Sequence, residues 1–333
     1  MIVHPYSRPR RLRKSDAIRS LVQENQIHAT DFIVPLFFME GENKKEEIAS
    51  MPGYFRFTLD LLLIEVKECY NLGLRSVLLF AKVPDTLKDA YGTESINPDG
   101  LMQRAIRAIK KTHPEMYVMT DVALDPYSSS GHDGLVVDGE IVNDQSVELL
   151  GEMALTHAQS GADMVAPSDM MDGRVGFIRE TLEENDFPNV GIMAYSVKYA
   201  SCFYGPFRDA LDSAPGFGDK KTYQMDPSNA EEALRECALD IQEGADIVMV
   251  KPGMPYLDMV RSVKDKFDVP VAAYQVSGEY AMLHAAAEKG WLNLEHAMFE
   301  SIIGFKRAGA NLIASYFAKD IAKLLKNKLS HDK

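Results

Sequence analysis

From Phe32 onward, short apolar runs alternate with amphipathic segments, and this alternation limits the folds open to the chain. The apolar runs lie at 33–39, 76–80, 117–122, 163–168, 191–198, 246–251, 271–277 and 312–318. Helical patterns separate many of them, at 58–72, 98–111, 144–160, 228–243 and 256–266. Nearly continuous apolar strands alternating with helices indicate a parallel sheet whose two faces are both covered.

Eight strand–helix units in about 300 residues predict an α/β fold of the (β/α)₈ barrel type. Several units share the same junction, in which a glycine ends a helix and an acidic residue begins the next strand, as in Gly161-Ala-Asp163 and Gly244-Ala-Asp246. A doubly wound open sheet is the alternative architecture. The first strand is not followed by G-x-G-x-x-G, which argues against a dinucleotide-binding fold.

Composition excludes several classes of partner. The chain has 333 residues, 46% of them hydrophobic, so it can bury a large core. Its net charge of -13 argues against nucleic acid or an anionic membrane surface as a partner. An apolar run near the ~20 residues needed to span a bilayer is missing, as is a hydrophobic signal core. Three widely spaced cysteines indicate neither a disulfide framework nor a cysteine zinc site, so we expect a cytoplasmic protein.

The organisation that we expect is an N-terminal arm at 1–30 and a barrel at 31–333, with a lid loop at about 199–227. The arm carries a basic run at 8–14 and then a short helical pattern through Ile18, Leu21 and Val22. It can be a solvated tail, or an arm that packs on the acidic surface of another subunit.

Polar side chains end six of the apolar runs. In a (β/α)₈ barrel, the carboxyl ends of the strands form the active site. The strand-end residues are Asp121, Ser168, Lys198, Lys251, Ser277 and Tyr316. The barrel prediction therefore brings these groups together at one face.

Lys198 and Lys251 are the most informative pair among them. Lysine is rarely buried unless it is paired or has a chemical role. Burial lowers the pKa of an amine, and a neutral amine attacks carbonyl groups to form Schiff bases. Two ammonium groups on adjacent strands also repel each other, so we expect at least one neutral amine near pH 7. The structural alternative is that each lysine extends its amine into solvent.

The segment at 199–227 is rich in glycine, proline and aromatic residues and also carries cations. A loop of this length in a compact domain is typically a lid. Its cations, Arg208, Lys220 and Lys221, suit a substrate carboxylate, although solvated surface charge explains them equally well.

A second turn-rich segment follows the third strand and contains Asp125 and Asp133. Carboxylates beside serine hydroxyls suit a hard cation such as Mg²⁺ rather than zinc. The alternative is that both aspartates cap turns.

The whole chain closely resembles the porphobilinogen synthase family, also called 5-aminolevulinate dehydratase. The resemblance runs from the basic segment at 8–13 to the stretch at 315–318. Its most specific stretches are APSDMMDGR at 166–174, YSVKYAS at 195–201, MVKPGMPYLD at 249–258 and YQVSGEY at 274–280.

The resemblance implies that two 5-aminolevulinate molecules condense to porphobilinogen with loss of two waters, an early step towards haem and chlorophyll. Lys251 and Lys198 would each form a Schiff base with one substrate, Lys251 on the propionate side and Lys198 on the acetate side. Arg208, Lys220 and Gln224 resemble the first set of substrate-binding residues. Ser277 and Tyr316 resemble the second set, which holds the other carboxylate.

The resemblance also implies a particular metal usage. Zinc-dependent members carry cysteines at the positions of Ala123, Asp125 and Asp133, so this chain is similar to the aspartate-bearing branch without catalytic zinc. Asp125 and Asp133 are its candidate ligands for an active-site cation, either Mg²⁺ or a monovalent ion. Glu236 matches the ligand of a regulatory Mg²⁺ at a subunit boundary, and the arm matches one that wraps a neighbouring barrel in homo-octamers.

Two other functions remain as alternatives. A class I aldolase uses one lysine on the same fold, and a barrel retained only for binding or assembly would make no pyrrole.

Overall fold

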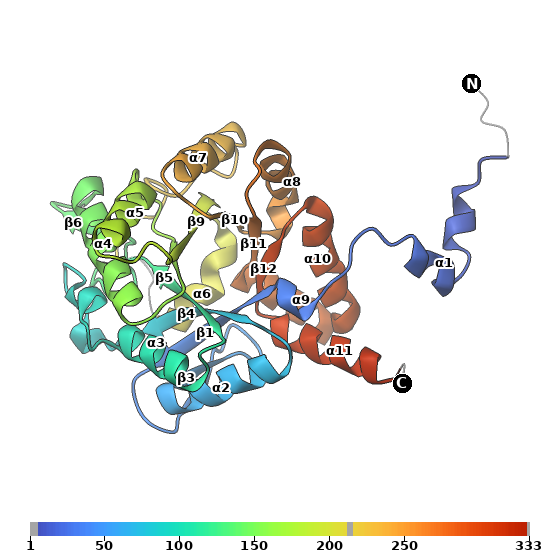
Figure 1. The fold of residues 1–333 in the computed structure, drawn as a ribbon, viewed down its shortest axis with the longest axis horizontal. Helices are drawn as coiled ribbons and strands as arrows, with labels where there is room; N and C mark the ends of the chain where they lie inside the picture. The colour runs from blue at the N-terminus through green and yellow to red at the C-terminus, as the bar shows by residue number, and fades with distance from the viewer. Residues whose placement is uncertain (1–5, 212–215, 332–333) are drawn as a thin grey trace.

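The computed structural model describes residues 6–211 and 216–331, and it is a closed barrel of eight parallel strands (Figure 1). Each strand pairs with its neighbour, and β12 pairs back with β1 through Phe32 opposite Ile313 and Ile33 opposite Ala314. The strands are β1 (Phe32–Met39), β4 (Ser76–Lys82), β5 (Tyr117–Val122), β8 (Met164–Pro167), β9 (Gly191–Lys198), β10 (Ile247–Lys251), β11 (Val271–Gln275) and β12 (Leu312–Ser315). The predicted (β/α)₈ architecture is confirmed.

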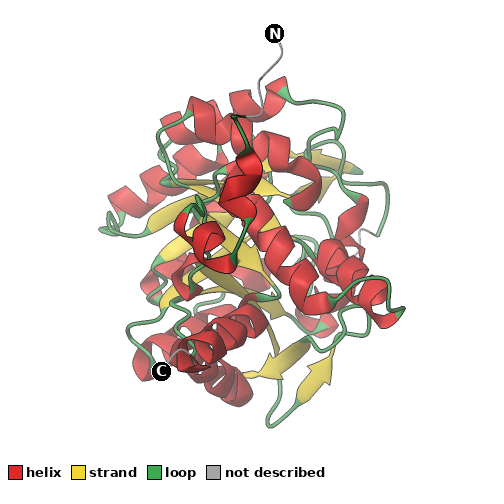
Figure 2. Cartoon of the chain, turned by 90° about the vertical axis from the view of Figure 1, so that its right-hand side faces the viewer, coloured by secondary structure: helices red, strands yellow, loops and turns green. Residues whose placement is uncertain are grey.

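Helices surround the strands on the outside of the barrel (Figure 2). The main ones are α2 (Leu59–Asn71), α3 (Leu101–Thr112), α4 (Asn143–Gln159), α5 (Arg174–Glu184), α7 (Glu231–Gln242), α8 (Leu257–Lys266), α10 (Leu294–Ala308) and α11 (Ala318–His331). Two more, α6 (Gly205–Leu211) and α9 (Ser277–Glu288), lie in the connections that follow β9 and β11. Among the described residues, no helix is both long and apolar enough to cross a membrane.

Local sequence explains why these elements form where they do. Every residue of β1 is buried because one face of the strand fills the barrel and the other packs under helices. Helix α3 buries Ala105, Ile106 and Ile109 at helical spacing, and it ends with basic residues that favour a helix C-terminus. Burying one such aliphatic side chain contributes about 1.5–3 kcal/mol.

Three expectations need correction. The strands expected at 271–277 and 312–318 end earlier, at Gln275 and Ser315, so Ser277 begins α9 and Tyr316 lies in the following turn. At this start of helix α9, the side chain of Glu279 accepts the backbone N–H of Val276 and so satisfies one of the free donors of the first turn.

The segment expected as a lid loop contains a 3₁₀ turn, η5 (Cys202–Tyr204), and helix α6, while residues 212–215 lie outside the described residues. Two hairpins were not expected: β2 (Lys45–Glu47) with β3 (Phe55–Thr58), and β6 (Leu135–Val137) with β7 (Glu140–Val142). Their strands are too short to give a clear alternation of apolar and polar residues.

The N-terminal segment extends away from the barrel (Figure 1). It contains η1 (Pro9–Arg13) and α1 (Asp16–Leu21), which begins with a Ser15 side-chain cap, and neither helix buries a residue. Its apolar side chains Leu12, Leu21 and Val22 are exposed. Residues 1–5 and 332–333 of the expected arm and barrel lie outside the described residues.

A buried ion pair ties the helices to the barrel. Arg174, the first residue of α5, makes two contacts of 3.1 and 3.2 Å with the carboxylate of Asp240 on α7. The same guanidinium donates to the carbonyl oxygen of Tyr195 on β9 at 3.5 Å. Because both ions are removed from water, each depends on the other for solvation.

We therefore expect Asp240→Ala to lower the free energy of unfolding by about 3–5 kcal/mol, because the buried guanidinium loses both close carboxylate contacts and, among the described residues, keeps an ion pair only with Asp169, at 3.8 Å. The matched control is Asp265→Ala, which removes an exposed ion pair with Arg261 on α8 and should change stability by about 0–1 kcal/mol. Urea unfolding followed by circular dichroism measures both. Equal effects of the two substitutions would contradict the role assigned to the buried pair.

Candidate active site

A buried cavity of about 30 Å³ lies at the carboxyl ends of the central strands. The ends of β5, β8, β9 and β10 supply part of its wall, and the segment after β9 covers it. Its lining residues are Asp121, Asp125, Asp133, Ser168, Lys198, Tyr204, Phe207, Arg208, Lys220, Gln224 and Lys251. Both lysines singled out from the sequence therefore face the same cavity.

The strand register brings the two lysines side by side. Lys198 and Lys251 are the last residues of β9 and β10, and they are paired directly opposite each other. The register shifts by one residue between Val248 and Val250. Without this irregularity, Lys251 would lie opposite Val197, and the alternation of side chains would turn the two lysines to opposite faces of the sheet.

Lys251 is surrounded by aromatic rings. Its Nζ lies 4.8–5.3 Å from the ring centroids of Tyr195, Tyr204, Phe207 and Tyr274. Among the described residues, no side chain or carbonyl forms a hydrogen bond or ion pair with this nitrogen. Burial and the charge of Lys198 lower the pKa of Lys251 to about 7, although nearby aspartates oppose the shift. A substantial fraction of the amine is then neutral at physiological pH.

Lys198 has a different environment. Its Nζ lies 3.0 Å from Asp133 Oδ2 and also donates to the carbonyl oxygen of Ser168. The other oxygen of Asp133 lies 2.6 Å from Lys220 Nζ, which is also 3.4 Å from Asp125. Burial alone would raise the pKa of Asp133, but Lys198 and Lys220 outweigh it and lower the value to about 2. Asp133 therefore stays ionised and holds both ammonium groups.

Asp121, near the end of β5, brings a third buried carboxyl group into the cavity. One of its oxygens, Oδ1, is buried without a hydrogen-bond partner among the described residues. Burial and the neighbouring charge of Asp125 raise the pKa of Asp121 to about 7, despite a hydrogen bond from Ser168 and the nearby lysines. Its strand-end position was the sequence signal for it, whereas Tyr204 and Phe207 had no such signal.

The cations expected on the lid divide into two groups. Arg208 on α6, Lys220 and Gln224 line the cavity. Lys221 does not join them, because its side chain is 75% exposed and contacts Asp219.

Neither Ser277 nor Tyr316 lines this cavity. The Tyr316 hydroxyl is 3.0 Å from that of Tyr274, whose ring also contacts Lys251. Ser277 is fully buried, and its hydroxyl has no partner among the described residues. A buried hydroxyl without a partner is unfavourable, so this group is suited to a polar ligand.

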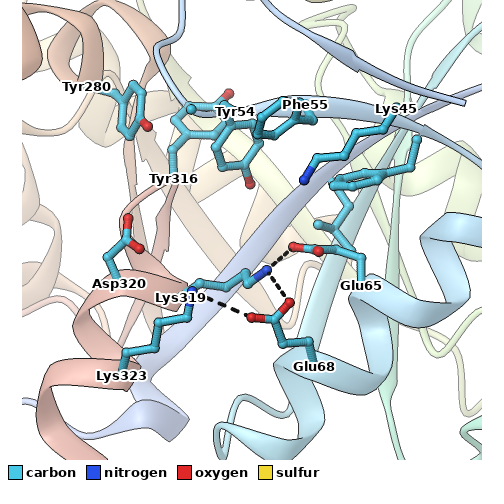
Figure 3. Close-up of a pocket in the computed structure, with 13 residues that line it drawn as sticks. Lys45, Tyr54, Phe55, Glu65, Glu68, Tyr280, Tyr316, Lys319, Asp320 and Lys323 are labelled. Atoms are coloured by element: carbon cyan, nitrogen blue, oxygen red, sulfur yellow. Dashed lines mark hydrogen bonds and ion pairs between the residues drawn. The ribbon is translucent and has the colours of Figure 1, made fainter. Parts of the chain in front are cut away.

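A larger cavity of about 290 Å³ lies on the other side of Tyr316, between the β2–β3 hairpin, α2 and α11 (Figure 3). Lys319 points towards Glu65 and Glu68 there and forms ion pairs with both. Because Lys319 is held as an ion pair by two carboxylates, its amine is a poor nucleophile towards a carbonyl group.

Glu236 lies away from the lysines, in a third cavity of about 360 Å³ that Asp172 and Glu232 also line. Burial raises the pKa of Glu236 to about 7, which Arg174 opposes and the neighbouring acidic side chains reinforce. Within the described ranges, no group of three or more histidine, cysteine, aspartate or glutamate side chains is placed to hold a metal ion. Glu236 alone can still serve Mg²⁺, which keeps several waters and needs only one or two carboxylates.

A (β/α)₈ barrel with a desolvated lysine at its strand ends is typical of enzymes that act on carbonyl compounds. Comparison with known proteins narrows the class. The family model "Delta-aminolevulinic acid dehydratase" matches residues 6–324. The chain therefore belongs to the delta-aminolevulinic acid dehydratase family, and it is a porphobilinogen synthase, a hydro-lyase that condenses two 5-aminolevulinate molecules to porphobilinogen in tetrapyrrole biosynthesis.

Individual relatives span nearly the whole chain. The delta-aminolevulinic acid dehydratase of Bradyrhizobium diazoefficiens is 54% identical over 96% of this chain and 91% of its own length. The chloroplastic enzyme of Physcomitrium patens is 54% identical over 96% of this chain and 74% of its own. A crystal structure of the Toxoplasma gondii enzyme with porphobilinogen has a TM-score of 0.94 and 53% identity, covering 96% of this chain and 91% of the other.

The environment of Lys251 predicts its reactivity. Only the neutral amine is acylated, so labelling of Lys251 by trace acetic anhydride should rise with pH and level off above about pH 7. In Lys198→Met the midpoint should move up by about one unit, because a repelling charge is lost and the charge of Asp133 is no longer neutralised by Lys198. Mass spectrometry of the Lys251 peptide measures the extent of labelling.

The control is the same peptide labelled in the unfolded chain, where lysine titrates near about 10.4. A folded-state midpoint equal to that of the unfolded chain would contradict the effect of burial.

Proposed function

We propose that Lys251 and Lys198 each bind one 5-aminolevulinate as a Schiff base, Lys251 on the propionate side and Lys198 on the acetate side of the product. The observation that carries the proposal is the register of β9 and β10, which places both amines at one cavity. The pKa of about 7 at Lys251 supports nucleophilic attack by this lysine first.

The chemistry follows from the imines. The neutral amine adds to the ketone carbon, and the resulting carbinolamine takes up a proton and loses water, which gives an iminium that withdraws electrons from the adjacent carbon. That carbon can then lose a proton and attack the second substrate. Asp121, with a pKa of about 7, is the carboxyl group in the cavity best suited to accept and return protons at neutral pH.

We assign the substrate carboxylates to two sets of residues. Arg208, Lys220 and Gln224 would hold the carboxylate of the substrate on Lys198, because Lys220 shares Asp133 with that lysine. Ser277 with Tyr316 would hold the carboxylate of the substrate on Lys251, because Tyr316 contacts Tyr274, whose ring lies beside Lys251. The cavity has room for only one or two waters, so the segment at about 199–227 must move as a lid to admit substrate. Lys220 would then exchange part of its pairing with Asp125 and Asp133 for the substrate carboxylate.

The proposed metal usage is that of the aspartate-bearing branch. Ala123, Asp125 and Asp133 offer no thiolates for zinc, so we expect no catalytic zinc. Asp125 and Asp133 converge on Lys220, where Mg²⁺ or a monovalent cation would have to displace the ammonium group. Glu236 is the better candidate, as the ligand of a regulatory Mg²⁺, because acidic side chains share its cavity and the cavity has room for bound water.

We also propose that the arm at 1–30 mediates assembly into a homo-octamer around the barrels at 31–333. The exposed apolar residues of α1 and the basic run before it suit a neighbouring acidic subunit. A cytoplasmic location fits three cysteines that are all free in the structure.

Borohydride trapping tests the two-lysine scheme. Reduction in the presence of 5-aminolevulinate should leave an adduct on Lys251 in the wild type. Lys198→Met should keep that adduct but lower porphobilinogen formation by more than about a hundredfold. Lys251→Met should lose the Lys251 adduct and porphobilinogen formation but keep an adduct on Lys198, and the surface control Lys111→Met should match the wild type.

An adduct on only one lysine, whose loss alone abolishes imine formation, would favour a class I aldolase instead. An enzyme that forms no adduct on either lysine would overturn the covalent scheme.

Metal removal tests the cation proposal. After EDTA treatment, the colour assay for porphobilinogen should show activity restored by Mg²⁺ or K⁺, and Glu236→Gln should reduce the response to Mg²⁺. Restoration by Zn²⁺ alone would contradict assignment to the aspartate-bearing branch.

A further inference from the structure

Glu279 is a buried carboxylate that the chemistry above does not use. It lies in the first turn of α9, is fully buried and, within the described part of the chain, accepts hydrogen bonds only from backbone N–H groups. Its Oε1 lies 2.5 Å from the nitrogen of Met254, and its Oε2 lies 2.5 Å from that of Val276 and 3.4 Å from that of Gly253. Among the described residues, no cation is paired with it.

These three N–H groups belong to two separate segments of the site. Gly253 and Met254 directly follow Lys251 and Pro252 at the end of β10. Val276 directly precedes Ser277 at the start of α9. One carboxylate therefore joins the chain that carries Lys251 to the chain that carries Ser277.

Packing leaves these segments little room to adjust. A Cβ on Gly253 would lie 2.3 Å from the ring of Phe305 and 2.9 Å from the carbonyl oxygen of Tyr274. A Cβ on Gly278 would lie 2.5 Å from the carbonyl oxygen of Phe203. Both segments are pressed against neighbouring backbone, so the link through Glu279 holds them in one geometry.

A capping role alone does not account for this carboxylate. Satisfying the start of α9 needs only the bond from Val276, whereas Glu279 also accepts two N–H groups from the segment after the neighbouring strand. Burial without a counter-charge raises the pKa of Glu279 to about 7, although the backbone hydrogen bonds oppose the shift. An uncharged side chain such as serine or asparagine could cap α9 without the cost of burying a carboxylate. The bonds to Gly253 and Met254 are therefore what distinguishes Glu279 from an ordinary cap.

We propose that Glu279 is a positioning residue that fixes the span between Lys251 and Ser277, the two groups that hold the ketone and the carboxylate of one substrate. The inference rests on the substrate contacts assigned above. In 5-aminolevulinate two methylene groups separate the ketone carbon from the carboxylate carbon, so one molecule reaches both anchors only over a narrow range of separations. A displacement of about 1 Å at such a site can lower the rate by about a hundredfold.

The test uses Glu279→Gln and the probe 4-oxopentanoate, which has the ketone and carboxylate of the substrate without its amine. Glutamine keeps the size of the side chain but offers one acceptor oxygen to three N–H groups, so at least one bond is lost. After borohydride reduction, mass spectrometry compares adducts on the Lys251 and Lys198 peptides. We expect the ratio of Lys251 to Lys198 adduct to fall about tenfold or more, and kcat/KM for porphobilinogen formation to fall with it.

The matched control is Asp163→Asn at the opposite end of the barrel. Asp163 also accepts a backbone N–H, that of Val118, and it pairs with Lys110. This substitution should lower stability without changing the adduct ratio. A general loss of stability in Glu279→Gln would lower both adducts together, and an unchanged ratio in a folded Glu279→Gln variant would overturn the proposal.

The two proposals fail in different ways. A wild-type enzyme that forms no adduct on Lys251 would refute the Schiff-base assignment. A wild-type adduct on Lys251 with an unchanged ratio in Glu279→Gln would leave that assignment intact and remove only the positioning role.

Discussion

The burial of two lysine side chains beside each other, at the ends of β9 and β10, is the constraint on which the rest of the site depends. Two ammonium groups on paired strand ends in a small buried cavity repel each other and lose hydration. The structure resolves this differently for each amine. Asp133 holds Lys198 as an ion pair, whereas aromatic rings enclose Lys251 and leave it with a pKa of about 7. Two chemically identical side chains thus acquire different reactivities, as suits an enzyme that must treat two copies of one substrate differently.

The carboxylates around the lysines are as unequal as the lysines themselves. Asp133 has a pKa of about 2 because two ammonium groups outweigh its burial, while Asp121 has a pKa of about 7 because burial prevails. One carboxylate therefore provides a fixed negative charge, and the other can exchange a proton at neutral pH. Their different environments thus give two aspartates of one segment opposite protonation behaviour.

Buried ions also connect the segments that carry these groups. Arg174 and Asp240 join α5 and α7 to β9, while Glu279 joins the segment after Lys251 to the one before Ser277. In both cases a buried ionisable side chain binds the backbone of another part of the barrel. Such links fix the distance between the two segments that they join, because each hydrogen bond has a narrow range of length and angle. Hydrophobic packing alone would allow that distance to vary. The barrel supplies the scaffold, and these contacts set the spacing within it.

The sequence by itself determined the eight strand–helix units, the barrel and the lysines at two strand ends, because apolar periodicity and strand-end polarity are local properties of the chain. The motifs around these lysines also indicated the protein family. Only the tertiary structure decided that a one-residue shift in register turns Lys251 towards Lys198, that Ser277 begins a helix, and that Lys221 faces solvent. Register, depth and ion pairing arise from contacts between residues far apart in the chain, so no local pattern contains them.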